Sequence, residues 1–267
     1  MSESSRECRN VLVSTTQRCG STWISSICCK ITSQSQKAEY VAGVPQRLMD
    51  LSMFGSDDAE RVAGFSQGVK EAAARTGSRV FKTHDLPLRL VPLFLEQNPD
   101  FWVFNIVRDF RDVMISRLMY SRYYLPTVGL SVECRFVAEH PHLTEVEMVR
   151  QFYGTKEMLD WLVQWKLFNE PVAHEHYVRL EYEALLDAAE LQRTVQLLGQ
   201  KLVSGGLSTE RAAAIAAASN FQEIDINLKQ DRKQREVKTA FCRKGVAGDY
   251  ERFLTKSQSN TLKLLMQ

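Results

Sequence analysis

The turn Thr15-Thr-Gln-Arg-Cys-Gly-Ser-Thr-Trp23 lies between a short apolar run and an amphipathic stretch. A glycine-containing turn that enters a helix leaves backbone N–H groups unsatisfied at the positive end of the helix dipole, and these groups bind phosphate. The hydroxyls of Ser21 and Thr22 and the cation of Arg18 add polar groups to the same turn. The kinase-type Gly-Lys-Ser/Thr sequence is absent, and an ordinary strand–helix turn remains the alternative interpretation.

A second polar group, Phe81-Lys-Thr-His-Asp-Leu-Pro87, follows another apolar run. Lys82 and His84 are two residues apart, so both side chains face the same way if strand geometry persists. His84 is suited to act as a general base because an unperturbed imidazole is largely neutral near pH 7. Lys82 can stabilise negative charge that develops during a reaction. For a histidine taken alone, a structural role is the commoner one.

Two further groups of residues carry basic side chains. The first can hold a second phosphate, or it is an ordinary helix start with a serine on one face. Arg108 closes the apolar run 101–107, and Ser116 follows it by eight residues, two turns into an expected helix. Residues 228–244 hold seven basic and two acidic side chains. Such a segment is either a solvated loop or a clamp over an anionic ligand.

The elements that position these residues alternate between strands and helices. Short apolar runs predict strands at 10–14, 78–83, 101–107 and 176–180. Amphipathic periodicity predicts helices at 21–31, 58–75, 109–120, 145–168, 183–198, 209–218 and 257–265. This order predicts an α/β fold, with one domain over residues 1–267 and a central, mostly parallel sheet flanked by helices. The motifs follow strands, so we expect them at the carboxyl edge, where such sheets bind ligands.

Composition excludes several classes of protein. The 267 residues include 34 Lys and Arg and 32 Asp and Glu, a formal net charge of +2. This balance argues against a polycation that coats nucleic acid or an anionic membrane. No apolar stretch is long enough for a membrane span, the N-terminus lacks the apolar region of a secretory signal, and the six cysteines form no regular framework. We therefore expect a cytoplasmic protein without nucleic-acid or membrane partners, and no carboxylate cluster suggests a metal.

In their order and context, these motifs resemble the sulfotransferase family that uses 3′-phosphoadenosine 5′-phosphosulfate (PAPS), with closest similarity to its cytosolic small-molecule branch. Residues 16–23 resemble the 5′-phosphosulfate loop, and Arg108 to Ser116 resembles the 3′-phosphate motif. Arg243-Lys-Gly-Val-Ala-Gly-Asp249 resembles the family signature R-K-G-x-x-G-D. Residues 82–87 resemble the K-T-H-L-P stretch with Asp85 inserted. The resemblance implies the P-loop-like sulfotransferase fold, PAPS as donor and 3′-phosphoadenosine 5′-phosphate (PAP) as product.

The resemblance also implies roles for individual residues. His84 would remove the acceptor proton, and Lys82 would stabilise the sulfuryl oxygens. Arg18 stands where the cytosolic branch has lysine, so it keeps the charge beside the leaving oxygen but cannot act as a proton donor. The nucleotide-binding set that the resemblance implies is Arg18, Cys19, Gly20, Ser21, Thr22, Trp23, Arg108, Ser116, Tyr182, Ser219, Phe221, Arg243, Lys244 and Gly245.

Two other functions remain open alongside a sulfotransferase that acts on a hydroxyl or amine of a small molecule. One is a P-loop-type kinase of a small molecule, against which the absent Gly-Lys-Ser/Thr weighs. The other is a nucleotide-binding protein without activity. Aromatic residues at 120–124 and 152–165 either line an acceptor pocket or belong to the core, and segments 35–77 and 121–144 are the expected acceptor-facing parts. The dimer motif of the cytosolic branch is not found after Phe253, and the oligomeric state stays open.

Overall fold

A computed structural model describes residues 8–34, 37–41, 58–123, 135–220 and 246–267. The chain divides into two compact units. Unit 1 contains residues 1–107 and 167–220, and unit 2 contains residues 108–166 and 221–267. The single domain predicted over residues 1–267 stays a prediction.

Unit 1 is built on a five-stranded sheet in the order β2-β3-β1-β4-β5. The strands are β1 (Asn10–Ser14), β2 (Glu39–Tyr40), β3 (Val80–Thr83), β4 (Phe101–Val107) and β5 (Tyr177–Glu181). Each of the four pairings between them is parallel. The apolar strand β4 is buried along its whole length, as expected for a sheet with both faces covered. The predicted α/β fold with a parallel sheet is therefore confirmed.

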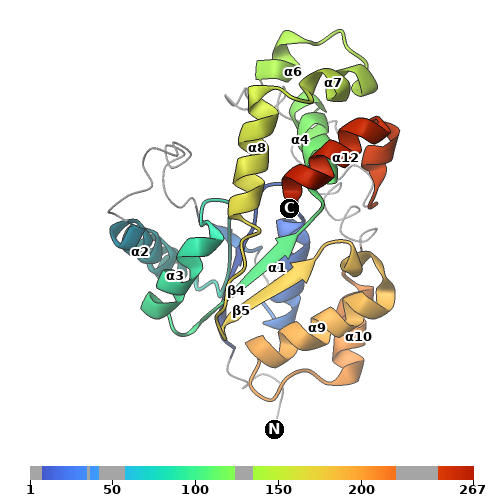
Figure 1. Ribbon diagram of the computed structural model, residues 1–267. Coiled ribbons are helices and arrows are strands. Elements are labelled where there is room, and N and C mark those ends of the chain that lie inside the picture. The colour runs from blue at the N-terminus through green and yellow to red at the C-terminus, as the bar shows by residue number, and fades with distance from the viewer. Residues whose placement is uncertain (1–7, 35–36, 42–57, 124–134, 221–245) are drawn as a thin grey trace. The chain divides into compact units, whose positions relative to one another are not determined.

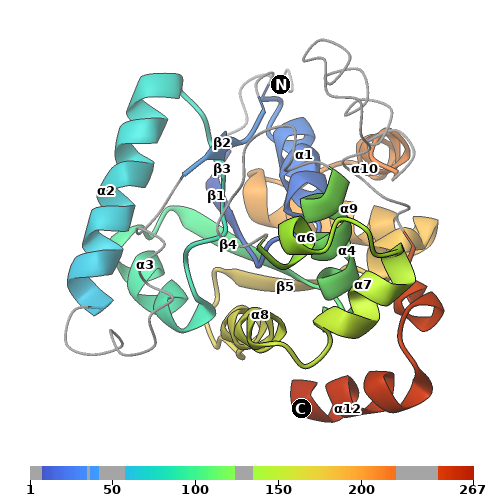
Figure 2. The ribbon, with the colours of Figure 1, turned by 90° about the horizontal axis from the view of Figure 1, so that it is seen from above.

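Helices cover both faces of this sheet (Figures 1 and 2). On one face lie α2 (Asp58–Thr76) and α3 (Val91–Gln97), which follows a short 3₁₀ turn at Leu88–Leu90. On the other face lie α1 (Ser21–Ile31), α9 (Ala188–Leu202) and α10 (Thr209–Ala217). A further 3₁₀ turn, Ala184–Leu186, connects β5 to α9. The connections thus bring every strand back in the same direction, so the carboxyl ends share one edge.

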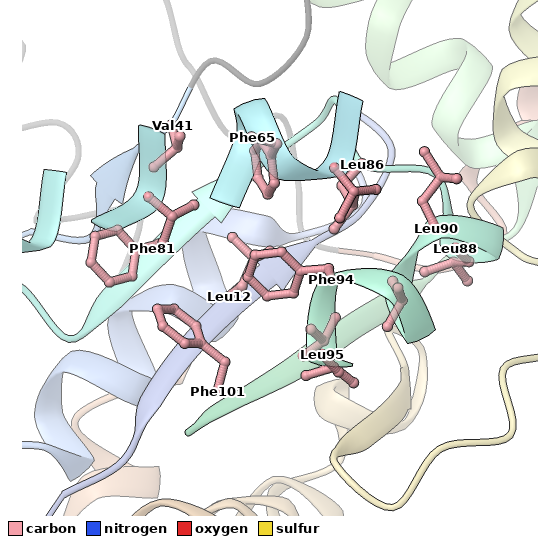
Figure 3. Close-up of a cluster of buried hydrophobic side chains, with 14 of the residues drawn as sticks. Leu12, Val41, Phe65, Phe81, Leu86, Leu88, Leu90, Phe94, Leu95 and Phe101 are labelled. Atoms are coloured by element: carbon pink, nitrogen blue, oxygen red, sulfur yellow. The ribbon is translucent and has the colours of Figure 1, made fainter. Parts of the chain in front are cut away.

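The core between the sheet and helices α2 and α3 is strongly aromatic (Figure 3). Phe94 of α3 contacts Phe65 of α2 and Phe101 of β4, with ring centroids 5.6 Å apart in both pairs. Leu12 and Phe81 complete the cluster from β1 and β3. Each such side chain contributes roughly 1.5–3 kcal/mol by leaving water. This packing fixes β1 and β3, whose carboxyl ends carry the site.

Unit 2 consists of helices and turns: α4 (Phe110–Tyr123), α6 (Arg135–Glu139), α7 (Glu145–Phe152), α8 (Lys156–Leu167), a 3₁₀ turn at Asp249–Arg252 and α12 (Lys256–Met266). The single helix predicted over residues 145–168 is wrong, because α7 and α8 are separate. Gly154 interrupts it with a φ of 84°, a left-handed conformation that glycine adopts without strain. The Thr155 hydroxyl then accepts a hydrogen bond from the Met158 N–H at 3.3 Å and starts α8.

Within the described residues, none of the helices combines the length and the apolar character that a membrane crossing requires.

Candidate functional site

The loop from β1 to α1 is anchored where it leaves the sheet. The Ser14 hydroxyl donates to the Leu86 carbonyl at 2.8 Å, and the Thr15 hydroxyl donates to the Ile106 carbonyl at 2.6 Å. The buried Asn105 amide donates to the Ser14 carbonyl at 2.8 Å. Contacts with both neighbouring strands therefore fix the loop at the carboxyl edge of the sheet, as the sequence predicted.

The loop then turns sharply into α1. Arg18 and Gly20 have positive φ values of 68° and 100°. Helix α1 begins at Ser21 with Gly20 as its N-cap, and no side chain makes a capping hydrogen bond there. Cys19 and Ser21 are both buried. An uncapped helix N-terminus with this geometry suits a phosphate group.

The Tyr182 side chain packs against this turn at Gly20. Its backbone N–H donates to the Val107 carbonyl at 2.8 Å, and its side chain is buried. A Cβ atom on Gly20 would lie only 3.0 Å from Tyr182 Cδ2 and 3.1 Å from Ile106 Cδ1. The Tyr182 ring also meets Trp23 edge-on, with centroids 5.7 Å apart. Glycine is therefore required at position 20 by both conformation and space.

Ser219 is tied to α1 through two contacts. The Trp23 indole N–H donates to the Ser219 carbonyl at 2.6 Å, and Lys30 Nζ donates to the Ser219 hydroxyl at 2.9 Å. Lys30 also bonds the carbonyl of Ala218, at the end of α10. The structure thus brings together Gly20, Trp23, Tyr182 and Ser219, four residues of the predicted nucleotide-binding set.

His84 lies directly after β3 and contacts the same loop. Its Nδ1 atom is 2.8 Å from the Thr15 carbonyl oxygen. A carbonyl oxygen only accepts, so Nδ1 carries the hydrogen and Nε2 carries the lone pair in the neutral ring. The ring also lies beside Tyr40 of β2, with centroids 6.0 Å apart. This geometry gives His84 a defined tautomer and orientation, which a general base requires.

Lys82, on β3, reaches the first turn of α1. Its Nζ atom donates to the Thr22 hydroxyl at 3.3 Å. Burial lowers the pKa of Lys82 from its ordinary value, and the nearby positive charge of Lys37 lowers it further. The ammonium group is therefore poorly solvated, and it would gain strongly from an anion at the N-terminus of α1. The expected juxtaposition of Lys82, His84 and the loop is present within unit 1.

In unit 2, Arg108 and Ser116 occupy the start and the second turn of the α4 region. Arg108 Nη2 donates to the Val246 carbonyl at 3.3 Å, and the Arg108 carbonyl accepts from the Trp165 indole at 2.8 Å. Ser116 lies on α4 and is almost buried. Arg108 is thereby joined to the described end of the Arg243–Asp249 motif. Phe221, Arg243, Lys244 and Gly245 lie outside the described residues.

Asp112 is a buried residue of this region that the sequence analysis did not consider. Its buried carboxylate accepts hydrogen bonds from the Gly248 N–H at 2.7 Å and the Tyr250 N–H at 3.0 Å. Burial raises the pKa of Asp112, while these two bonds and the charge of Arg108 oppose that shift. The only sequence signal was an acidic residue in the first turn of the helix that also carries Ser116.

The aromatic residues considered for an acceptor pocket belong mainly to the core of unit 2. Phe152, Trp161 and Trp165 are buried, and the rings of Phe152 and Trp161 lie 4.7 Å apart. Tyr123 is exposed and donates to Glu145 at 2.8 Å. Tyr124 lies outside the described residues. These placements favour the core interpretation for the tryptophans.

No cluster of three or more potential metal ligands occurs within the described ranges. The described groups around the β1–α1 loop include the Lys82 ammonium, backbone N–H groups and the His84 imidazole. Such groups suit the transfer of a charged group between a nucleotide and an acceptor.

A family model and several solved structures are similar to this chain. A family model described as "Sulfotransferase domain" matches residues 9–267. Retinol dehydratase in complex with retinol and PAP matches with a TM-score of 0.61 and 18% identity, over 97% of this chain and 80% of that one. Mouse sulfotransferase SULT7A1 complexed with PAP matches with a TM-score of 0.54 and 18% identity, over 96% of this chain and 82% of that one. No curated protein sequence matches. At this identity the structural likeness shows the fold alone.

Proposed function

Since the chain belongs to the sulfotransferase family, we propose that it transfers a sulfuryl group from PAPS to a hydroxyl or amine of a small-molecule acceptor. The family and enzyme class predicted from the sequence are confirmed by the family match over residues 9–267. The donor assignment is further supported by PAP in the two structurally similar proteins.

One observation in unit 1 supports the proposed reaction most strongly. The uncapped N-terminus of α1, the Lys82 ammonium and the His84 imidazole converge on one loop. The 5′-phosphosulfate would accept hydrogen bonds from backbone N–H groups between Gly20 and Thr22, because the Trp23 N–H already donates to the Gly20 carbonyl at 2.9 Å. Lys82 would lie beside the sulfuryl oxygens, where its poorly solvated charge is most effective.

The proposed reaction is an in-line displacement. The acceptor oxygen or nitrogen forms a bond to sulfur while the bond from sulfur to the 5′-phosphate oxygen breaks and PAP leaves. His84 Nε2 accepts the acceptor proton, and Nδ1 keeps its bond to Thr15 throughout. Arg18 stabilises the negative charge on the leaving phosphate but donates no proton. No step requires a metal.

The remaining nucleotide contacts follow the sequence motifs. We assign the 3′-phosphate to Arg108 and Ser116 together with Arg243, Lys244 and the Gly245 N–H. The adenine is assigned to Trp23, Tyr182, Ser219 and Phe221. Trp23 and Tyr182 are only 4% and 3% exposed, so little of either residue lies at the surface for adenine to contact.

The acceptor is proposed to be a small molecule, since retinol dehydratase binds retinol and androsterone. The absence of a regular cysteine framework supports a cytoplasmic location. Neither point distinguishes among phenols, alcohols, amines and sugars.

A screen with PAPS labelled in its sulfur tests the proposal. Acceptors from each of these classes are incubated with the wild-type protein and with the His84→Ala variant, and labelled product is measured together with PAP release. We expect label in at least one class with the wild type and none with the variant. A protein that instead phosphorylates acceptors from ATP and Mg²⁺ is the kinase alternative.

A further inference from the structure

Residues 246–250 are held against α4 by hydrogen bonds of two kinds. In one the segment accepts from Arg108, and in the others it donates to Asp112. The Arg108 guanidinium donates to the Val246 carbonyl, while the Asp112 carboxylate accepts from the Gly248 and Tyr250 N–H groups. All of these residues belong to unit 2. The Asp112 side chain is only 2% exposed, so both of its backbone bonds form away from solvent.

A buried carboxylate at this place is unexpected on electrostatic grounds. Asp112 stands four residues from Arg108 and four from Ser116, which are both assigned to an anionic group. A negative charge so close to a phosphate site repels the phosphate. If charge alone decided the affinity, removing the carboxylate would make phosphate bind more tightly.

We propose that Asp112 is a positioning residue for the 3′-phosphate subsite, which fixes Arg108 and the chain that follows Gly245 in their binding arrangement. The inference rests on the proposed function and extends it to a residue that touches no substrate. The Gly248 and Tyr250 N–H groups bond different oxygens of Asp112, and a carboxylate presents an acceptor at both of these positions. Fixing Arg108 and residues 246–250 in place favours phosphate binding by more than the negative charge of Asp112 opposes it.

The variant Asp112→Asn distinguishes the positioning role of the Asp112 carboxylate from the effect of its negative charge on the phosphate. The amide has nearly the same shape, but one of its two polar atoms is a donor, which faces an N–H of Gly248 or Tyr250. The matched control is Asp109→Asn, which removes the same charge near the start of α4. Asp109 accepts hydrogen bonds from the backbone N–H and the side chain of Arg111.

The measurement compares dissociation constants for PAP and for adenosine 5′-phosphate, which lacks the 3′-phosphate. We expect Asp112→Asn to raise the dissociation constant for PAP at least tenfold. The dissociation constant for adenosine 5′-phosphate should change by less than twofold. Asp109→Asn should leave both within twofold of wild type. Unchanged or tighter PAP binding by Asp112→Asn overturns the inference, as does an equal loss for both ligands.

A second variant covers the case in which Asp112→Asn folds poorly. Gly248 has a φ of 78°, and a Cβ there would meet no atom of the described residues within 4 Å, so the strain of Gly248→Ala lies mainly in the backbone turn. We expect it to show the same selective loss of PAP. The double variant should be no worse than the poorer single variant, because both disturb one contact. Fully additive losses overturn the inference.

Amide hydrogen exchange of the nucleotide-free protein separates this inference from the proposed function. Asp112→Asn should speed exchange at Gly248 and Tyr250 at least tenfold, and Asp109→Asn should not. An unchanged exchange rate at Gly248 and Tyr250 would show that Asp112 does not hold this segment in place, and it would overturn the inference. If exchange rises but the wild type binds no PAP, the proposed function fails, and the phosphate role of Asp112 fails with it.

Discussion

His84 Nδ1 donates a hydrogen bond to the backbone carbonyl of Thr15 across 2.8 Å. Thr15 itself is fixed, because its hydroxyl donates to the Ile106 carbonyl and its N–H to the Thr83 carbonyl. Strand β4 therefore holds the loop that orients an imidazole attached to β3. This bond places the hydrogen of the neutral His84 ring on Nδ1, and the proposed function uses the Nε2 lone pair to accept the acceptor proton.

Replacing His84→Ala should lower kcat by about 10²–10⁴-fold, the usual contribution of a general base. The dissociation constant for PAP should stay within a few-fold of wild type, because the phosphate loop does not depend on the imidazole for its fold. Steady-state kinetics and calorimetric titration measure the two quantities. His142→Ala, at an exposed position of unit 2, is the matched control and should retain full activity. Unaltered turnover in His84→Ala would remove it from the mechanism.

Replacing Gly20→Ala should destabilise the protein by roughly 1–3 kcal/mol, the usual cost of placing a non-glycine residue in a strained conformation. The new methyl would also press on Tyr182 and Ile106. Gly64→Ala in α2 is the control, because nothing lies within 4 Å of its Cβ position, and it should gain about 0.5–1 kcal/mol. Urea unfolding compares them. A Gly20→Ala variant as stable as wild type would contradict the described turn.

The burial of Lys82 predicts that the free energy of unfolding depends on pH. Burial lowers its pKa in the folded state, so between that pKa and its ordinary value of 10.5 the unfolded chain holds more protons than the folded one. Stability from this group therefore rises with pH across that window, and the penalty is fully present below it. Lys82→Met should accordingly be more stable than wild type at pH 7, and this difference should shrink toward pH 10.5.

Melting temperatures of Lys82→Met and wild type across this pH range provide the test. Lys156→Met is the control, since its exposed ammonium pairs with Asp160 and carries no burial penalty. A Lys82→Met advantage that is constant or grows with pH would contradict the burial of the lysine charge. The same variant should lose sulfuryl transfer, because the cation beside the donor is gone.

Arg108 and Arg111 form a matched pair for the 3′-phosphate assignment. Arg108→Ala should weaken PAP about 10–100-fold, as expected from a charge-assisted bond worth roughly 1.5–3 kcal/mol. Arg111 instead bonds Asp109 and Ser259 and lies over the Tyr250 ring, so Arg111→Ala should affect stability more than affinity. Calorimetric titration with PAP measures both variants. Equal losses of affinity would argue against the assignment of Arg108.

The parts of the fold predicted well are those with strong local signals. Residues 10–14, 21–31 and 101–107 form β1, α1 and β4 with the predicted bounds, because apolar runs and helical periodicity determine them locally. The two-residue strand β2 was missed, since only its pairing with β3 defines it. The break at Gly154 was missed because periodicity continues on both sides of it. Local sequence shows neither feature clearly.

The site follows the same rule. Lys82 and His84 were proposed from their types and their spacing, and in the structure they contact Thr22 and Thr15. Their roles stay predictions. Asp112 was not identified, because its partners Gly248 and Tyr250 are more than 130 residues away in the chain. A long-range contact to backbone atoms leaves no mark on the local pattern of side chains.

Thermal unfolding with added nucleotide tests the central claim most directly. A ligand that binds only the folded protein raises the melting temperature with its concentration. The account predicts a saturable increase with PAP, and none with ATP and Mg²⁺ at the same concentrations. Stabilisation by ATP and Mg²⁺ without any effect of PAP would contradict it.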